Sequence, residues 1–248
     1  MLFLMFLQVV YSAPNIPPKP SSKNYVYDYA GLINPNDSAQ IEKIGNAIES
    51  ASGAQVVVVT VNDIGEYPIE DYALQLFRNW GIGQKDKNNG VLLLVDKKRL
   101  LEGKSGKVRI EVGYGLEGAI PDSVAGSILD DYVLPSWDKK NYSEGILNGY
   151  KAISAKVAKE YNININEFNT DNYAVKTTET NSNLKNIIAT IILLIILLSI
   201  FGGGRKGRFW WTGGGGFGGF GGGGGFGGFG GSGGGFGGGS AGGGGASR

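Results

Sequence analysis

The 248-residue chain contains no cysteine and no histidine. These two absences exclude cysteine nucleophiles, Ser-His-Asp triads, disulfide bonds and the usual ligand sets of zinc. A bound metal would have to take its ligands from the oxygen atoms of Asp, Glu, Asn or the backbone, a donor set that favours Ca²⁺ or Mg²⁺. Any acid–base chemistry would depend on carboxylates, Lys or Tyr.

The chain also lacks an excess of charge, and its glycine is unevenly distributed. The formal net charge is +1, so the composition indicates no nucleic-acid partner. Of the 44 glycines, 29 follow Phe201, and a segment so poor in apolar surface cannot fold by itself. We therefore expect one globular domain, over residues 24–161, which is long enough for a single core.

Two apolar segments indicate export and membrane attachment. Residues 1–12 are typical of a secretory signal peptide, although no Lys or Arg precedes the apolar run. The second apolar run, residues 187–201, is followed by basic residues and then by aromatic residues, a pattern typical of the cytoplasmic end of a membrane span. We predict a single transmembrane helix over residues 184–204. The protein would then be a single-pass protein of the cell membrane, with its domain outside and its C-terminal tail in the cytoplasm.

The segments on either side of this span are predicted to be linkers. Residues 162–183 are polar, rich in Asn and Thr, and lack a core pattern, so they predict a flexible stalk. Residues 205–248 consist mainly of glycine punctuated by phenylalanine and predict a disordered tail. A second interpretation is that the phenylalanines of the tail act as weak points of self-association or docking.

Helical and strand patterns alternate within the domain. Apolar residues at helical spacing predict four helices, at residues 34–53, 68–80, 123–133 and 142–161. Asn34 is a good cap for the first helix, and Pro135 is expected to end the third. Short apolar runs predict strands at residues 55–61, 91–95 and 108–112, the last with Arg109 and Glu111 pointing outward. Strands that are apolar on both sides require helices on both faces, so we predict an α/β fold: a three-layer α/β/α sandwich around a mostly parallel sheet.

The third strand leads into Gly113, Gly115 and Gly118, which match the G-x-G-x-x-G fingerprint of dinucleotide binding. That site requires a helix that begins directly at the glycines, and here Pro121 moves the helix start to about Asp122. No strand-like segment follows to carry the acidic residue that binds the ribose. We therefore predict no nicotinamide or flavin nucleotide, and we interpret the glycines as allowing a tight connection between strand and helix.

Several motifs in order along the chain resemble the TPM-domain family. They are DYAGL at residues 28–32, WGIG at 80–83, NGVLLLV at 89–95, RIEVGYGLEG at 109–118 and PD at 121–122. The YgcG-like bacterial members share the whole layout of signal peptide, domain, span and glycine-rich tail. The resemblance implies an α/β/α sandwich and an extracytoplasmic site. Its functional implications diverge, because plant thylakoid-lumen relatives are weak acid phosphatases linked to photosystem II repair, an animal relative modulates a receptor, and some members bind divalent cations.

Four carboxylates lie in the connections between elements, namely Asp28, Asp86, Glu117 and Asp122. If several converge at one edge of the sheet, their mutual repulsion would be relieved by Ca²⁺ or Mg²⁺, and we predict them as metal ligands. The alternative is that they cap helices, shape turns or lie in solvent. No residue stands out as a catalytic nucleophile. The sequence thus favours a module that binds membrane-protein complexes, with a weak metal-dependent phosphatase and a structural envelope protein without a ligand site as alternatives.

Overall fold

The computed structural model describes residues 14–164 and 239–248, which belong to one unit of the chain formed by residues 1–175 and 233–248. The predicted signal peptide, the predicted span, most of the stalk and the tail up to residue 238 lie outside the described residues. Within the described part of the chain, no helix has the length and apolar character needed to cross a membrane.

A sheet of five strands in the order β1-β2-β3-β4-β5 forms the centre of the fold. The strands are β1 (Val26–Asp28), β2 (Gln55–Val61), β3 (Gly90–Asp96), β4 (Val108–Gly113) and β5 (Ala241–Ser247). The first three are parallel, whereas β4 is antiparallel to β3 and β5 is antiparallel to β4. The α/β class is therefore confirmed, but the sheet is mixed rather than mostly parallel.

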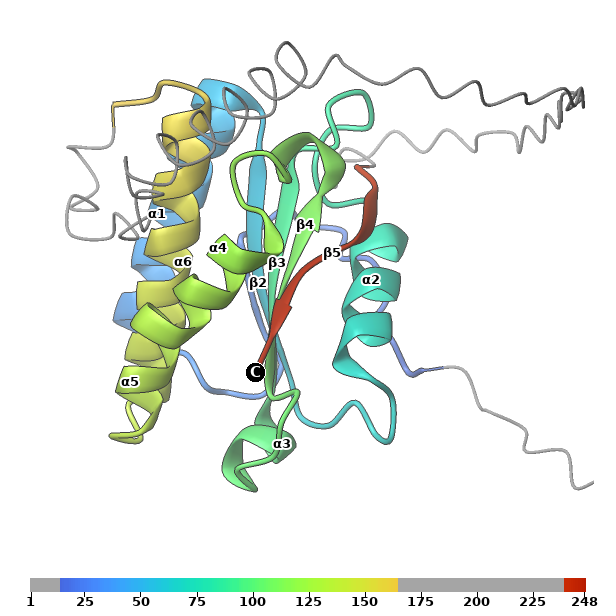
Figure 1. Cartoon of the computed structure of the whole chain (residues 1–248), viewed down its shortest axis with the longest axis vertical. Coiled ribbons are helices and arrows are strands. Elements are labelled where there is room, and N and C mark those ends of the chain that lie inside the picture. Colours follow the sequence, from blue (N-terminus) through green and yellow to red (C-terminus); the bar gives the residue numbers. More distant parts are fainter. Residues whose placement is uncertain (1–13, 165–238) are drawn as a thin grey trace, which may run out of the picture. The chain divides into compact units, whose positions relative to one another are not determined.

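The reversal between β3 and β4 follows from the connection that joins them. Only residues 97–107 lie between the two strands, and a parallel pair needs a crossover of a dozen or more residues over one face of the sheet. The connection contains the short helix α3 (Lys97–Leu101), which lies beyond the end of the strands (Figure 1) and not on a face. The chain therefore returns directly alongside β3.

Helices cover both faces of the sheet, as the apolar strands predict (Figure 1). One face carries α1 (Pro35–Ser52), α4 (Asp122–Ile128), α5 (Leu134–Trp137) and α6 (Tyr142–Glu160), and the other carries α2 (Ile69–Trp80). The alternation along β2 divides the core accordingly. Val56 and Val58 belong to the cluster beneath α1 and α6, while Val57 and Val59 belong to the cluster beneath α2.

Two helix ends follow the local sequence signals, and one does not. The side chain of Asn34 accepts a hydrogen bond from the backbone N–H of Asp37 at 2.9 Å, and Gly53 ends α1 in the left-handed conformation. The prediction that Pro135 ends a helix is wrong. A π-helical turn, η2 (Leu129–Val133), follows α4, and α5 then begins at Leu134. Pro135 thus lies in a first helical turn, where its missing N–H is tolerated.

The end of the predicted tail forms an edge strand. Residues 241–247, which the composition predicts as disordered, pair with β4 as β5, with Ile110 opposite Ala246 and Gly113 opposite Ala241. The prediction of disorder is wrong for these residues. Local composition could not indicate this strand because its partner lies about 130 positions earlier in the chain.

Candidate functional site

The strand directions separate the four predicted metal ligands. Asp28 ends β1, at the edge of the sheet where the parallel strands β1, β2 and β3 end. Asp86 precedes β3, and Glu117 and Asp122 follow the antiparallel strand β4, which places all three toward the opposite edge. Within the described residues, no three acidic side chains come together in a way that could hold a metal ion.

Asp28 is engaged by its own neighbourhood. Its two carboxylate oxygens accept hydrogen bonds from the backbone N–H groups of Leu32 at 3.0 Å and Ile33 at 2.9 Å. The hydroxyl of Thr60 on β2 donates to the same carboxylate. Asp28 therefore closes the turn that leads from β1 toward α1, which is the capping role considered as the alternative for these carboxylates.

Two of the four, Glu117 and Asp122, lie near each other and near the end of the chain. Both line a hollow of about 500 Å³, whose wall also contains Gly244. An oxygen of Asp122 accepts a hydrogen bond of 2.7 Å from the backbone N–H of Gly245. Asp86 is exposed in its turn and does not line this hollow. The pair is thus placed beside β5, a contact that sequence reasoning did not anticipate.

β5 pairs with the edge of β4 and contacts α2 on one side and α4 on the other (Figure 1). We call the surface that these three elements present to β5 the tail groove. Polar side chains of the groove make hydrogen bonds to main-chain atoms of the strand. Arg78 donates to the carbonyl of Ala241 at 2.9 Å, and Arg109 donates to the carbonyl of Gly243 at 2.8 Å. Because these contacts read the backbone, they recognise an extended conformation more than a particular side chain.

Other contacts fix the two ends of the bound segment. At one end, the side chain of Asn88 accepts a hydrogen bond from the backbone N–H of Ser240 at 2.8 Å. At the other, the guanidinium of Arg248 donates to both carboxylate oxygens of Asp130 at 2.6 Å, and this hydrogen bonding lowers the pKa of Asp130. The register of β5 against β4 is therefore fixed at both ends, because a shift of one residue would break the contacts of Ser240 and Arg248.

The hydroxyl of Ser247 donates to Glu70 on α2. Burial acts to raise the pKa of Glu70, but hydrogen bonding, above all from Ser247, outweighs it and the pKa is lowered. Glu70 is thereby held in the charged form that accepts from the strand.

A buried ion pair lies on β4, next to β5. Arg109 and Glu111 are 4% and 0% exposed, and their Nη2 and Oε2 atoms are 2.7 Å apart. The prediction that these side chains point outward is therefore wrong, because α2 packs over the face on which they lie and β5 pairs along the edge of β4 beside them. Burial raises the pKa of Glu111, and the positive charge of Arg109 opposes that rise. Arg109 also donates a hydrogen bond to the carbonyl of Gly243. The same guanidinium therefore pairs with Glu111 and holds β5.

The glycines of β5 allow its backbone to lie close to the tail groove. A Cβ atom on Gly245, whose φ is +139°, would overlap the carbonyl oxygen of Ile110, and one on Gly242 would overlap the ring of Tyr114. In the described part of the chain, a Cβ on Gly244 would meet only the side chain of Glu117, whose nearest atom, Oε1, is 2.9 Å away. The glycine content at the end of the tail is therefore required at particular positions by the fit of the strand.

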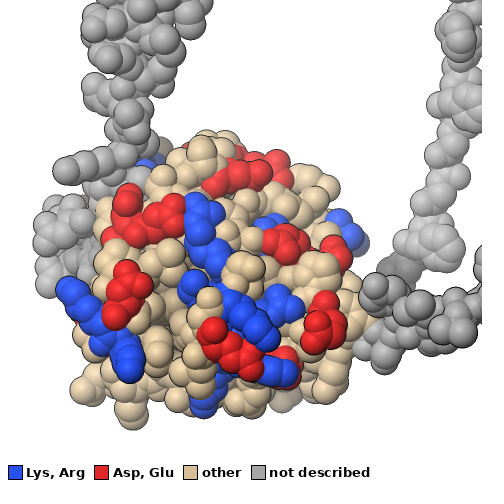
Figure 2. Space-filling view, turned by 60° about the horizontal axis from the view of Figure 1, so that its bottom comes forward, with Lys and Arg blue, Asp and Glu red and all other residues tan. Residues whose placement is uncertain are grey.

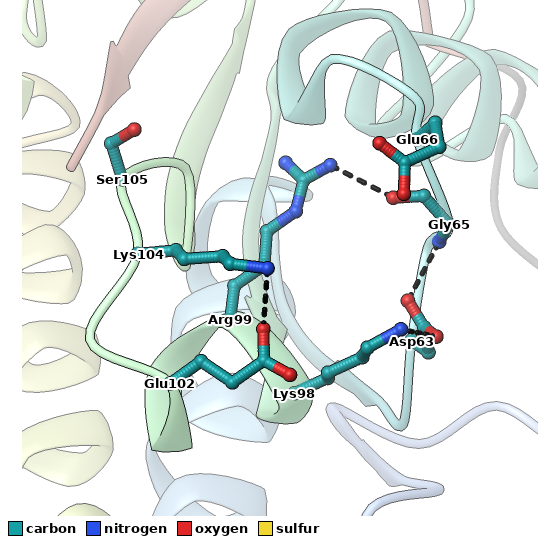
Figure 3. Close-up of a pocket in the computed structure, with 8 residues that line it drawn as sticks. All are labelled: Asp63, Gly65, Glu66, Lys98, Arg99, Glu102, Lys104 and Ser105. Atoms are coloured by element: carbon teal, nitrogen blue, oxygen red, sulfur yellow. Dashed lines mark hydrogen bonds and ion pairs between the residues drawn. The ribbon is translucent and has the colours of Figure 1, made fainter.

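A second hollow, of about 420 Å³, lies where β2 and β3 end (Figure 3). Its cations are paired with nearby acids: Lys98 with Asp63 at 2.6 Å and Lys104 with Glu102 at 2.7 Å. Arg99 donates to the carbonyl of Gly65 at 3.0 Å. Acidic and basic side chains are likewise interspersed over this end of the molecule (Figure 2).

The bond from Lys98 lowers the pKa of Asp63. The charges of this hollow therefore tie the loop after β2 to α3. This arrangement does not present a set of charges of one sign to a ligand.

The glycine fingerprint has a structural explanation. A Cβ on Gly113 would overlap the carbonyl oxygen of Asn88, and one on Gly115 would overlap that of Lys87. Among the described residues, a Cβ on Gly118 would meet no atom within 4 Å. Two of the three glycines thus allow the turn before β3 to pack closely against the end of β4. The close backbone approach is as expected, but it is made to this turn and not within the connection between strand and helix.

The comparisons agree with this architecture. The model of the TPM domain family matches residues 26–156, more than half of the chain, and the chain therefore belongs to the TPM domain family. The solution structure of the N-terminal domain of a protein from P. gingivalis is 31% identical, with a TM-score of 0.52, over 60% of this chain and 96% of that one.

Two further solution structures are more distant. The BA42 protein of the psychrophilic bacterium Bizionia argentinensis is 16% identical over 54% of this chain and 86% of that one, with a TM-score of 0.44. The N-terminal domain of a Corynebacterium glutamicum protein is 14% identical over 60% and 87%, with a TM-score of 0.39. No curated protein matches the chain.

Proposed function

We propose that this TPM-domain protein is a binding module that holds an extended segment of a protein partner in the tail groove. The observation that supports the proposal is the set of side chains, above all Arg78, Arg109 and Asp122, that bind main-chain atoms of β5. Addition of a strand to a sheet edge is a common mode of peptide recognition, in which backbone hydrogen bonds give the affinity. In this chain the occupant is its own C-terminal segment.

We further propose that the module works outside the cell at the membrane, on a partner that belongs to a membrane-protein complex. The support is in the sequence, where an apolar start resembles a signal peptide and residues 187–201 form a second apolar run. A domain attached in this way meets its partners at the membrane surface.

Displacement of the internal strand tests the binding function. In the full chain, Gly245→Ala places a methyl group against the carbonyl oxygen of Ile110 and should release β5. Gly244→Ala is the matched control, because its methyl group meets only the mobile end of Glu117. A fluorescent peptide with the sequence of residues 239–248, GSAGGGGASR, should bind the Gly245→Ala chain at least tenfold more tightly than the wild type or the control, measured by fluorescence anisotropy.

Circular dichroism establishes that the variants are folded. If Gly245→Ala prevents folding, the chain that lacks residues 239–248 takes its place. Equal and weak binding of the peptide to the folded variants and the wild type would rule out the proposed function.

As a second function, we propose that the protein binds a divalent cation in the hollow that Glu117 and Asp122 line. Carboxylate oxygens suit Ca²⁺ and Mg²⁺, and a bound cation would relieve the repulsion between the two acids. A weak phosphatase would use such a cation to polarise a phosphoryl group. Ca²⁺ should raise the melting temperature of the full chain by a few degrees, and Asp122→Asn should abolish the rise. Phosphate release that requires Mg²⁺ or Ca²⁺ and is lost in Asp122→Asn would instead favour the phosphatase.

A further inference from the structure

The pairing of β5 constrains how the chain meets a membrane. Residues 239–248 are bound to the same domain that residues 26–164 form, through the ladder between β4 and β5 and through the pair of Arg248 with Asp130. If residues 187–201 crossed the membrane once, the segment after them would lie on the side opposite the domain. A docked β5 and a single span therefore exclude each other in one molecule.

The docked strand is held by contacts that are reversible. Four consecutive glycines, residues 242–245, must be ordered, and glycine loses more backbone freedom on ordering than any other residue. The pair of Arg248 and Asp130 is exposed to solvent and is screened by salt. Insertion of an apolar helix into a bilayer is effectively irreversible by comparison. Insertion should therefore prevail over docking.

Resting on the proposed function of the tail groove, we propose that the docked strand is autoinhibitory and that insertion of residues 187–201 as a span removes it. Before insertion the strand fills the groove. After insertion the groove is open on the outer side, and an extended segment of an extracytoplasmic partner takes the place of β5.

The groove defines the chemistry of this partner segment. It needs glycine where Gly245 meets the backbone of Ile110 at φ +139°, and Gly243 has a positive φ of +93°. A basic side chain at the position of Arg248 would meet Asp130. The partner is thus an extended, glycine-rich segment whose last bound residue is basic.

The test uses the absence of cysteine from the chain. A variant with Ser21→Cys and Ser232→Cys carries one thiol before the domain and one shortly before the bound strand. When the chain is inserted in phosphatidylcholine vesicles, a membrane-impermeant maleimide should label it once. The two thiols then lie on opposite sides of the membrane, whichever way the chain is oriented. The reference is the same variant with Leu194→Lys and Leu197→Lys, in which charges prevent insertion, and it should be labelled twice.

The second measurement is binding of the fluorescent GSAGGGGASR peptide to the same two preparations. We expect the inserted chain to bind at least tenfold more tightly than the reference chain, whose own strand is docked. Two labels or none on each inserted chain would overturn the inference, and so would exclusion of the peptide from the inserted chain while the Gly245→Ala chain binds it. Failure of the Gly245→Ala chain to bind would instead count against the proposed function itself.

Discussion

Asp28 belongs to a motif of the family, and its carboxylate stabilises the fold. Asp28 accepts two backbone N–H groups and the hydroxyl of Thr60. Asp28→Ala would leave these donors without their acceptor, so we expect a loss of about 1–3 kcal/mol in the free energy of unfolding. Urea denaturation measures this loss. Asp86→Ala, in an exposed turn, is the control and should change the value by less than about 0.5 kcal/mol.

The buried carboxylate of Glu111 gives a pH dependence opposite to that of most acidic residues. Burial raises the pKa of Glu111 above its ordinary value of 4.5. The unfolded chain therefore loses this proton first as the pH rises, and the contribution of Glu111 to stability, complete below about pH 4.5, decreases until the pH passes the raised pKa. Relative to Glu111→Gln, the wild type should lose stability in thermal melts as the pH rises from about 4.5 through the raised pKa. A constant difference over this range would show that the pKa is not raised.

At the level of elements, the sequence predicts what depends on near neighbours. The cap at Asn34, the end of α1 at Gly53 and the two-sided burial of β2 all follow from local pattern. The antiparallel course of β4 follows from a connection, residues 97–107, that is too short for a crossover, a constraint that apolar periodicity alone does not express. β5 depends on a partner strand far away in the sequence. The candidate site shows the same division. Asp122 was singled out by its motif, but its contact with Gly245 required the tertiary structure.

The connection after β4 offers a prediction with an internal control. A methyl group on Gly115 would overlap the backbone of Lys87, which cannot move aside as a side chain could. Gly115→Ala should therefore destabilise the domain by about 1–3 kcal/mol. Gly118→Ala places its methyl group away from all described atoms, so it should be neutral or stabilise by up to about 1 kcal/mol through the unfolded state. Equal effects of the two substitutions in urea denaturation would contradict the close packing of this turn.

For the whole molecule, the decisive feature is that the last strand covers the edge of the sheet. Deletion of residues 239–248 would expose the N–H and C=O groups of β4 together with the ion pair of Arg109 and Glu111. An open strand edge pairs readily with another copy. In the background of Leu194→Lys and Leu197→Lys, which prevents association through the apolar run, we expect the truncated chain to self-associate with increasing concentration in sedimentation experiments. The GSAGGGGASR peptide should restore the monomer by refilling the tail groove, whereas a truncated chain that stays monomeric without the peptide would show that β5 does not protect this edge.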